Sequence, residues 1–142
     1  MSIRCFVAAT LLMWAGGAGA LDLVVVVSPA SGVERLSRDE VINLYMGRAR
    51  KLPGGTAARP IDLASGAGRE KALFYQRLLS RDLAEVKAYW ARLTFSGQAS
   101  PPVQADNPDQ VLDLVARNPG GVGYVDRTLV DARVRIVYSF GE

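Results

Sequence analysis

Four consecutive valines near the start of the sequence constrain the fold more than any other feature. They close the apolar run LDLVVVV at residues 21–27. Valine is β-branched, which restricts its first side-chain torsion and favours strands. Apolar and polar residues do not alternate in the run, so it predicts a strand covered on both faces, as strands in parallel sheets are.

A helix is predicted shortly after this strand. Ser37 and Glu40 have the spacing of a capping box, in which each side chain accepts a hydrogen bond from the backbone of the other residue. Leu36 and Val41 occupy the two positions of a hydrophobic staple. Gly47 is placed to end this helix.

The rest of the chain alternates strand and helix patterns. Strands are predicted at 58–63, 122–125 and 134–138. Helices are predicted at about 69–79, from a restart at 80–82 up to 95, and at 108–117. The last strand alternates enough to lie at a sheet edge. This order predicts an α/β fold in which helices flank a mixed, mostly parallel sheet, with one domain over residues 21–142.

One predicted helix carries an aromatic group. Val86, Tyr89, Trp90 and Leu93 recur at helical spacing and define one apolar face, and Phe95 follows them. Core packing is the favoured interpretation of the three aromatic residues, and a ligand-stacking site is the alternative.

Residues 1–20 have the pattern of a cleavable signal peptide. Arg4 supplies a positive charge, residues 5–14 are almost wholly apolar, and the segment ends in Ala18-Gly19-Ala20. The apolar run is too short to span a bilayer. Cys5 lies at the start of the run, whereas a lipidated cysteine would follow it. Cleavage after Ala20 and a periplasmic location are predicted; an uncleaved anchor or a buried first helix is the alternative.

The residues that remain after position 20 exclude several kinds of chemistry. The sequence has no histidine, and its single cysteine is Cys5. This removes the usual zinc ligands, a Ser-His base and a thiol nucleophile, and it disfavours an enzyme. Several carboxylates lie at predicted helix starts, and no metal or cofactor site is predicted. The net charge of +3 comes without a long Lys/Arg run, which argues against nucleic-acid or membrane binding.

The segment ASGAGR at residues 64–69 has the pattern of an anion site. It follows a predicted strand and opens a helix, whose first amides are free to bind an oxyanion. Gly66 and Gly68 allow close backbone approach, Ser65 adds a hydroxyl, and Arg69 adds a fork of donors. A plain strand-to-helix turn with Arg69 at the surface explains the same pattern equally well.

Three motifs resemble a known family, the phosphate-type periplasmic substrate-binding proteins of ABC transporters. The first is SRDEVINLYMG at residues 37–47, and the last is NPGGVGYV at residues 118–125. Between them, Tyr-Trp at 89–90, Phe-Ser-Gly at 95–97 and Pro-Pro at 101–102 resemble a set of short relatives. The resemblance covers nearly all of residues 21–142.

The resemblance implies one lobe of a type-2 periplasmic-binding-protein-like fold. It implies binding of phosphate or a similar oxyanion, normally on behalf of an ABC importer. In the family, a Ser-Gly-Thr-Arg-like turn at a helix start contributes to the anion site. Ser65, Gly66 and Arg69 lie there, and Ala67-Gly68 replaces the threonine.

Two functional hypotheses follow. The first is an exported binding protein for phosphate or a similar oxyanion, serving as the substrate-binding component of an ABC-type phosphate uptake system. The second is an envelope protein-interaction module that retains the lobe without its ligand site. Because full-length family members close two lobes on the ligand, a single lobe predicts weak binding.

Overall fold

The valine run forms the central part of the sheet. It folds as β1 (Leu23–Val27), and all five of its side chains are fully buried. The structure is a computed structural model that describes residues 21–140. The predicted signal peptide at residues 1–20 lies outside the described residues.

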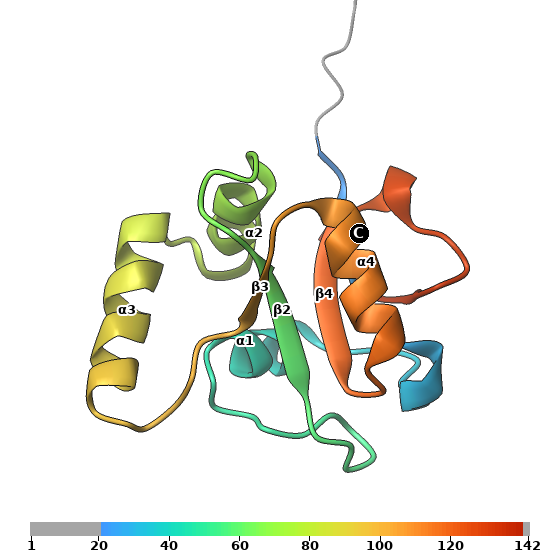
Figure 1. Cartoon of the computed structure of the whole chain (residues 1–142), viewed down its shortest axis with the longest axis horizontal. Helices are drawn as coiled ribbons and strands as arrows, with labels where there is room; N and C mark the ends of the chain where they lie inside the picture. The colour runs from blue at the N-terminus through green and yellow to red at the C-terminus, as the bar shows by residue number, and fades with distance from the viewer. Residues whose placement is uncertain (1–20, 141–142) are drawn as a thin grey trace, which may run out of the picture.

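The described residues contain five strands, which form one mixed sheet in the order β3-β2-β4-β1-β5. Figure 1 labels the neighbouring strands β3, β2 and β4. The other strands are β2 (Arg59–Leu63), β3 (Val103–Ala105), β4 (Gly121–Asp126) and β5 (Arg135–Ser139). The predicted mixed α/β sheet is confirmed, and β5 lies at an edge as expected.

The strand directions differ from the prediction that most pairings are parallel. β2 pairs in parallel with β3 and β4, whereas β1 is antiparallel to both β4 and β5. The pairings are therefore evenly divided. Burial of β1 on both faces was predicted correctly, but burial depends on what covers a strand and carries no information about the direction of its neighbours.

The short strand β3 was not predicted. It follows Pro101-Pro102 and forms only where it pairs with β2, from Val103 opposite Ile61 to Ala105 opposite Leu63. Three residues are too few for a periodic pattern, so the partner strand decides this element.

The part of the chain that the structure describes has four α-helices. They are α1 (Arg38–Tyr45), α2 (Glu70–Leu79), α3 (Leu83–Phe95) and α4 (Pro108–Arg117). The predicted capping box is present: the Glu40 amide donates to Oγ of Ser37 over 3.1 Å, and the Ser37 amide donates to Oε1 of Glu40 over 3.0 Å. Leu36 and Val41, the predicted staple, are both buried.

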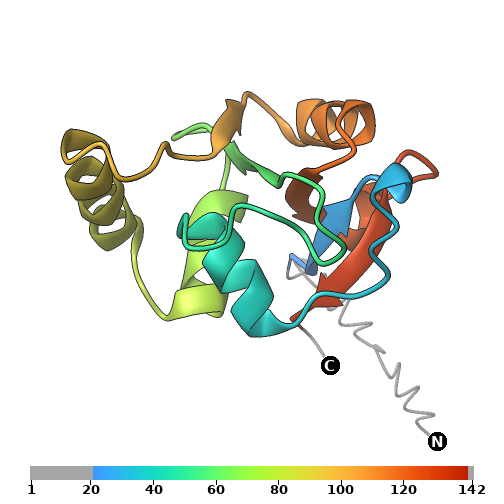
Figure 2. The same cartoon turned by 90° about the horizontal axis from the view of Figure 1, so that it is seen from below.

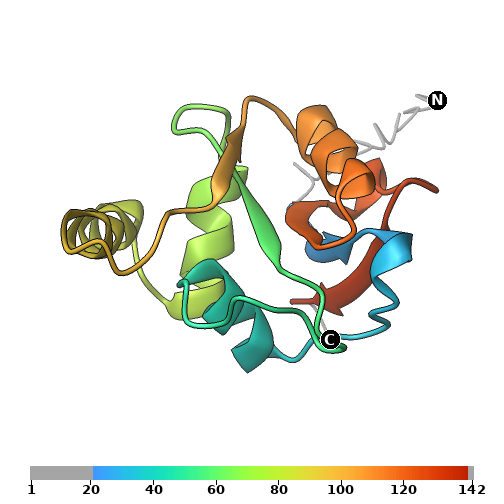
Figure 3. The ribbon, with the colours of Figure 1, turned by 60° about the horizontal axis from the view of Figure 1, so that its bottom comes forward.

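The helices cover the two faces of the sheet unequally. Figure 2 shows α4 on one side of the sheet, with α1 and α2 on the other. In Figure 3, α3 lies at one end of the molecule, beyond α2 and far from β5. None of the described helices has the length and hydropathy needed to cross a bilayer.

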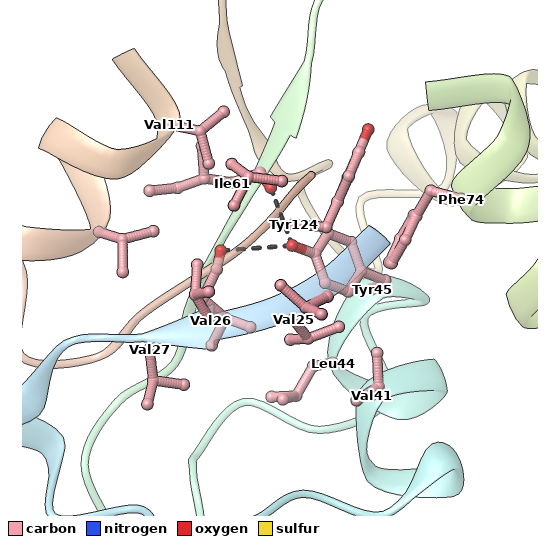
Figure 4. Packing of buried hydrophobic residues seen from close by; sticks show 14 of the residues in the cluster. Val25, Val26, Val27, Val41, Leu44, Tyr45, Ile61, Phe74, Val111 and Tyr124 are labelled. Carbon is pink, nitrogen blue, oxygen red and sulfur yellow. Dashed lines mark hydrogen bonds between the residues drawn. The ribbon is translucent and has the colours of Figure 1, made fainter. Parts of the chain in front are cut away.

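An aromatic cluster joins α1 and α2 to the sheet (Figure 4). The rings of Phe74 and Tyr124 are stacked with centroids 3.8 Å apart, and the Tyr45 ring meets Phe74 edge-on at 4.9 Å. The buried Tyr45 hydroxyl donates to the carbonyl oxygen of Ile61 over 2.9 Å.

Core packing of the α3 aromatics is confirmed only in part. Trp90 is buried and Tyr89 is half-buried, with its hydroxyl donating to the Met46 carbonyl over 2.7 Å. Phe95 is 97% exposed, so its predicted place in the core is wrong. Phe95 is the last residue of α3, and α3 lies at one end of the molecule, beyond α2 (Figure 3).

Candidate functional site

The predicted anion-binding segment forms the turn between β2 and α2. Gly66 and Gly68 have φ values of +87° and +134°. Residues other than glycine rarely adopt this backbone conformation. The amide of Ala67 donates to the carbonyl of Ala64 over 3.1 Å, which tightens the turn. The two glycines are therefore required for the chain to leave β2 and enter α2.

The start of α2 has no side-chain cap. Arg69 occupies the capping position in a helical conformation and offers no acceptor to the first turn. By contrast, α1, α3 and α4 are capped by Ser37, Asp82 and Asn107. The first amides of α2 therefore keep their donor capacity and the partial positive charge of a helix N-terminus.

The four predicted site residues lie together at this exposed turn. Ser65, Gly66, Gly68 and Arg69 are all exposed. Within the part of the chain that the structure describes, the Arg69 guanidinium takes part in no side-chain hydrogen bond or ion pair. The turn therefore presents a hydroxyl, backbone amides and one cation to solvent, which is a donor set suited to an oxyanion.

Glu70, the first residue of α2, brings a negative charge to the same turn. One of its carboxylate oxygens, Oε2, is buried and has no hydrogen-bond partner among residues 21–140. A Cβ atom built on Gly68 would collide with this oxygen, so the carboxylate lies directly against the turn. A negative charge is favourable beside a helix N-terminus, but it repels an incoming anion. The sequence prediction did not include Glu70.

A buried carboxylate lies just before the turn, at Asp62 in β2. Asp62 is 5% exposed; it accepts hydrogen bonds from Tyr75 over 2.6 Å, from the Leu63 amide over 2.8 Å, and from Tyr124. The Lys71 ammonium lies 3.8 Å from Oδ2 of Asp62. Burial, together with the negative charge of Asp62, raises the pKa of Tyr75 and of Tyr124 above the ordinary phenol value. Both phenols therefore stay protonated and act as donors.

A pocket of about 630 Å³ lies beside these residues, between α3 and the β2–β3 edge of the sheet. Its polar lining consists of Asp62, Ser65, Lys71, Lys87, Thr94 and Gln104. Its apolar lining includes Trp90, Phe95 and the two prolines at 101–102.

Only one predicted site residue, Ser65, lines this pocket. Gly66, Gly68 and Arg69 belong to the turn but not to the pocket wall. Asp62 and Lys71 were missed by the sequence prediction. The available signal was the carboxylate of Asp62 inside the otherwise apolar strand segment Ile61-Asp62-Leu63, because a charged residue in a buried strand requires nearby partners.

Among residues 21–140, His, Cys, Asp and Glu side chains form no group of three that could hold a metal ion. The turn and the pocket present hydrogen-bond donors, charged groups and apolar surface.

The fold is that of one half of a periplasmic binding protein. The chain is similar to an ABC-type phosphate transport receptor from Vibrio cholerae, with a TM-score of 0.65 and 16% identity over 82% of this chain and 45% of that chain. It is also similar to a phosphate ABC transporter substrate-binding protein from Clostridium perfringens, solved with bound phosphate. That match has a TM-score of 0.63 and 14% identity over 82% of this chain and 44% of the other.

These likenesses confirm the predicted resemblance at the level of the fold. This chain aligns with less than half of each matched chain. The part that it shares with them therefore corresponds to a single lobe. No protein-family model matches the sequence, and no curated protein does.

Proposed function

We propose that this chain is an exported binding protein for phosphate or a similar oxyanion, with the anion held at the start of α2. The observation that carries the proposal is the uncapped N-terminus of α2, which follows a turn with two left-handed glycines. The fold supports it, because a solved structure with the same half-fold contains bound phosphate.

Each residue of the turn has a role in this proposal. The first amides of α2 donate to the anion, and the helix dipole favours its charge. Ser65 donates its hydroxyl, and Arg69 pairs with two oxyanion oxygens at once. Gly66 lets the backbone approach the anion without a Cβ in the way, and Gly68 adopts the left-handed conformation that the turn requires.

Weak binding is expected of this site. The four residues are exposed, so their hydrogen bonds to an anion replace hydrogen bonds to water and contribute little net free energy. We expect a dissociation constant of about 1 mM, or roughly −4 kcal/mol. A role as the substrate-binding component of an ABC-type phosphate uptake system, acting in the periplasm after cleavage near Ala20, belongs to the same proposal.

Calorimetric titration with phosphate and with sulfate tests the site. Phosphate should bind in the millimolar range, and Arg69→Ala should weaken it about tenfold, because a charge-assisted bidentate contact contributes roughly 1.5 kcal/mol or more. Arg135→Ala is the matched control: it removes the same charge from β5, at the sheet edge opposite β3. Absence of heat at 10 mM phosphate, or equal loss in both variants, would contradict the proposal.

A second candidate function is an envelope protein-interaction module. The observation in its favour is Phe95, a large apolar side chain that is 97% exposed on a chain spanning 45% of its structural match. This candidate predicts that Phe95→Ala abolishes recovery of a defined envelope partner, whereas Arg69→Ala does not. Recovery that is equal for the wild type and Phe95→Ala would argue against it.

A further inference from the structure

We infer that α3 is the contact surface of a homodimer, in which the α3 helices of two copies of this chain pack side by side in opposite directions. The contact is made by the α3 stripe, which consists of Ala84, Ala88, Ala91 and Phe95. The inference goes beyond the proposed anion site and does not depend on it, because that site lies at the start of α2.

The α3 stripe is exposed along its whole length. All four of its side chains are exposed, and the last of them, Phe95, is almost fully so. α3 packs on the rest of the molecule through Val86 and Trp90, which are buried. With about 3.6 residues per turn, the stripe lies on the side of the helix that points away from these two residues. Because α3 lies at one end of the molecule (Figure 3), a second copy can reach this side.

The spacing of the stripe suits a second copy of the same helix. Its members are separated by four, three and four residues, the spacing of the a and d positions that meet when two helices pack along each other. This spacing reads the same in both directions. An antiparallel copy therefore places Ala88 opposite Ala91 of the second copy, and Phe95 opposite Ala84.

The sizes of these side chains are complementary in that register. Alanines at the centre let the two helix axes approach closely. Each Phe95 ring then covers an alanine at the far end of the other helix, which removes the largest part of the apolar stripe from water. Both ends of the contact are equivalent, as a two-fold axis requires.

The charges beside the stripe favour the antiparallel direction. Glu85 and Arg92 lie on the same side of the stripe, and both line a groove between α1 and α3. They occupy e positions of the heptad, and the e positions of two antiparallel helices face each other, so Glu85 of each copy lies near Arg92 of the other. In a parallel pair, Lys87 would face Arg92, and these like charges repel.

Both charged residues are free to make this contact. Arg92 is exposed and belongs to no ion pair among residues 21–140. Glu85 pairs with Arg81 of its own helix over 2.7 Å, and a carboxylate can accept from a second cation. The contact therefore adds two symmetric ion pairs at the rim of the α3 stripe.

A weak dimer is expected from a contact of this size. One helix of 13 residues packed on another covers less than the roughly 1,200 Å² of a standard interface, so we expect a dissociation constant of about 100 µM. The dimer should therefore form only at high protein concentration.

Sedimentation equilibrium of the full-length chain, from about 10 to 500 µM, provides the test. Ala91→Glu places two like charges at the centre of the contact and should weaken the dimer at least tenfold. Phe95→Ala should weaken it about fivefold, because less apolar surface is covered. Ala72→Glu is the matched control: it adds the same charge at an exposed position of α2 and should leave the dimer unchanged.

Mixing two charge-reversal variants tests the antiparallel direction. Glu85→Lys sets positive charges against each other at both rim contacts, and Arg92→Glu sets negative charges against each other there. Each variant alone should dimerise about threefold more weakly than the wild type. In an equal mixture, opposite charges meet again at both contacts, and the association should return to the wild-type value.

The outcomes decide the inference. Weakening by changes in the α3 stripe but not by Ala72→Glu, with recovery on mixing, supports it. A chain that stays monomeric at about 500 µM leaves the stripe to a different partner and overturns it. A dimer that survives Ala91→Glu, or that Ala72→Glu weakens equally, uses another surface and also overturns it. A mixture that associates no better than the single variants rules out the antiparallel pair.

Discussion

The Tyr124 hydroxyl in β4 donates a hydrogen bond to Oδ1 of Asp62 in β2, inside the protein. Tyr75 from α2 donates to the other carboxylate oxygen over 2.6 Å. A single buried carboxylate therefore links the sheet to the helix that starts at the candidate anion site. A buried carboxylate is costly without hydrogen-bond donors, so loss of either tyrosine hydroxyl should lower the stability of the fold.

Removal of the Tyr124 hydroxyl should destabilise the fold. Tyr124→Phe keeps the ring stacked on Phe74 but leaves the buried Asp62 carboxylate without one donor. We expect the free energy of unfolding to fall by about 1–3 kcal/mol, measured by urea denaturation. Tyr138→Phe is the control, since its ring lies half-buried on the edge strand β5, and it should change stability by less than about 0.5 kcal/mol. Equal effects would show that the Asp62 contact contributes nothing.

Stability should fall at alkaline pH. The pKa values of Tyr45, Tyr75 and Tyr124 are raised above the ordinary value of 10.0, first by burial and then by the charge of Asp62. In the unfolded chain these phenols lose their protons above pH 10.0, whereas the folded protein keeps them. The unfolded state then binds fewer protons, so the free energy of unfolding decreases as pH rises past that value.

Each of these tyrosines contributes a slope of about 1.4 kcal/mol per pH unit above its unfolded pKa. Urea denaturation at several pH values from 8 to 11.5 measures the total slope, and Tyr124→Phe should reduce it by one such increment. A slope that does not change in the variant would mean that Tyr124 ionises equally in both states.

Neutralising Glu70 should strengthen anion binding. Its carboxylate lies against Gly68 at the start of α2 and repels an anion bound there. Glu70→Gln removes this charge and keeps the shape of the side chain, and we expect phosphate affinity to rise about two- to fivefold, from an interaction of roughly 0.3–1 kcal/mol. Glu34→Gln is the control for net charge, because Glu34 is exposed and far from α2 in sequence. Calorimetric titration measures the phosphate affinity of both variants. An unchanged or lower affinity for Glu70→Gln would show that the Glu70 charge does not act on the bound anion.

A side chain at Gly123 should destabilise the fold. A Cβ atom there would lie 2.6 Å from Cγ1 of Val111 and 2.9 Å from Cγ2 of Val115, both on the α4 face that packs against β4. Gly123→Ala should therefore push α4 away from the sheet and cost about 1–3 kcal/mol of stability. Gly54→Ala offers a comparison, because no atom lies within 4 Å of its Cβ and only its positive φ is strained. Similar losses in thermal or urea denaturation would mean that α4 accommodates the extra methyl group.

Local sequence signals predicted most elements of the fold. The valine run, the Ser37–Glu40 capping box and the apolar face through Trp90 each depend on residues within a few positions of one another. Such signals act through torsional preference, backbone capping and periodicity, which require no knowledge of the distant chain.

The candidate site was predictable only in its contiguous part. The glycine turn from Ser65 to Arg69 is visible because its residues are neighbours in sequence. The Asp62 cluster joins β2, α2 and β4, and the pocket adds α3 and β3. These contacts form only when strands far apart in the chain pair with each other.

The sequence alone determined that a buried strand lies within residues 21–27, that α1 starts at a capping box, and that a glycine turn opens α2. The tertiary structure alone decided that β1 lies antiparallel between β4 and β5, that β3 exists, and that Phe95 faces solvent. It also decided that Ser65 shares a pocket with Asp62 and Lys71. The reason is physical: torsions, caps and periodic burial are set by nearby residues, whereas strand direction and exposure depend on which distant segments pack alongside.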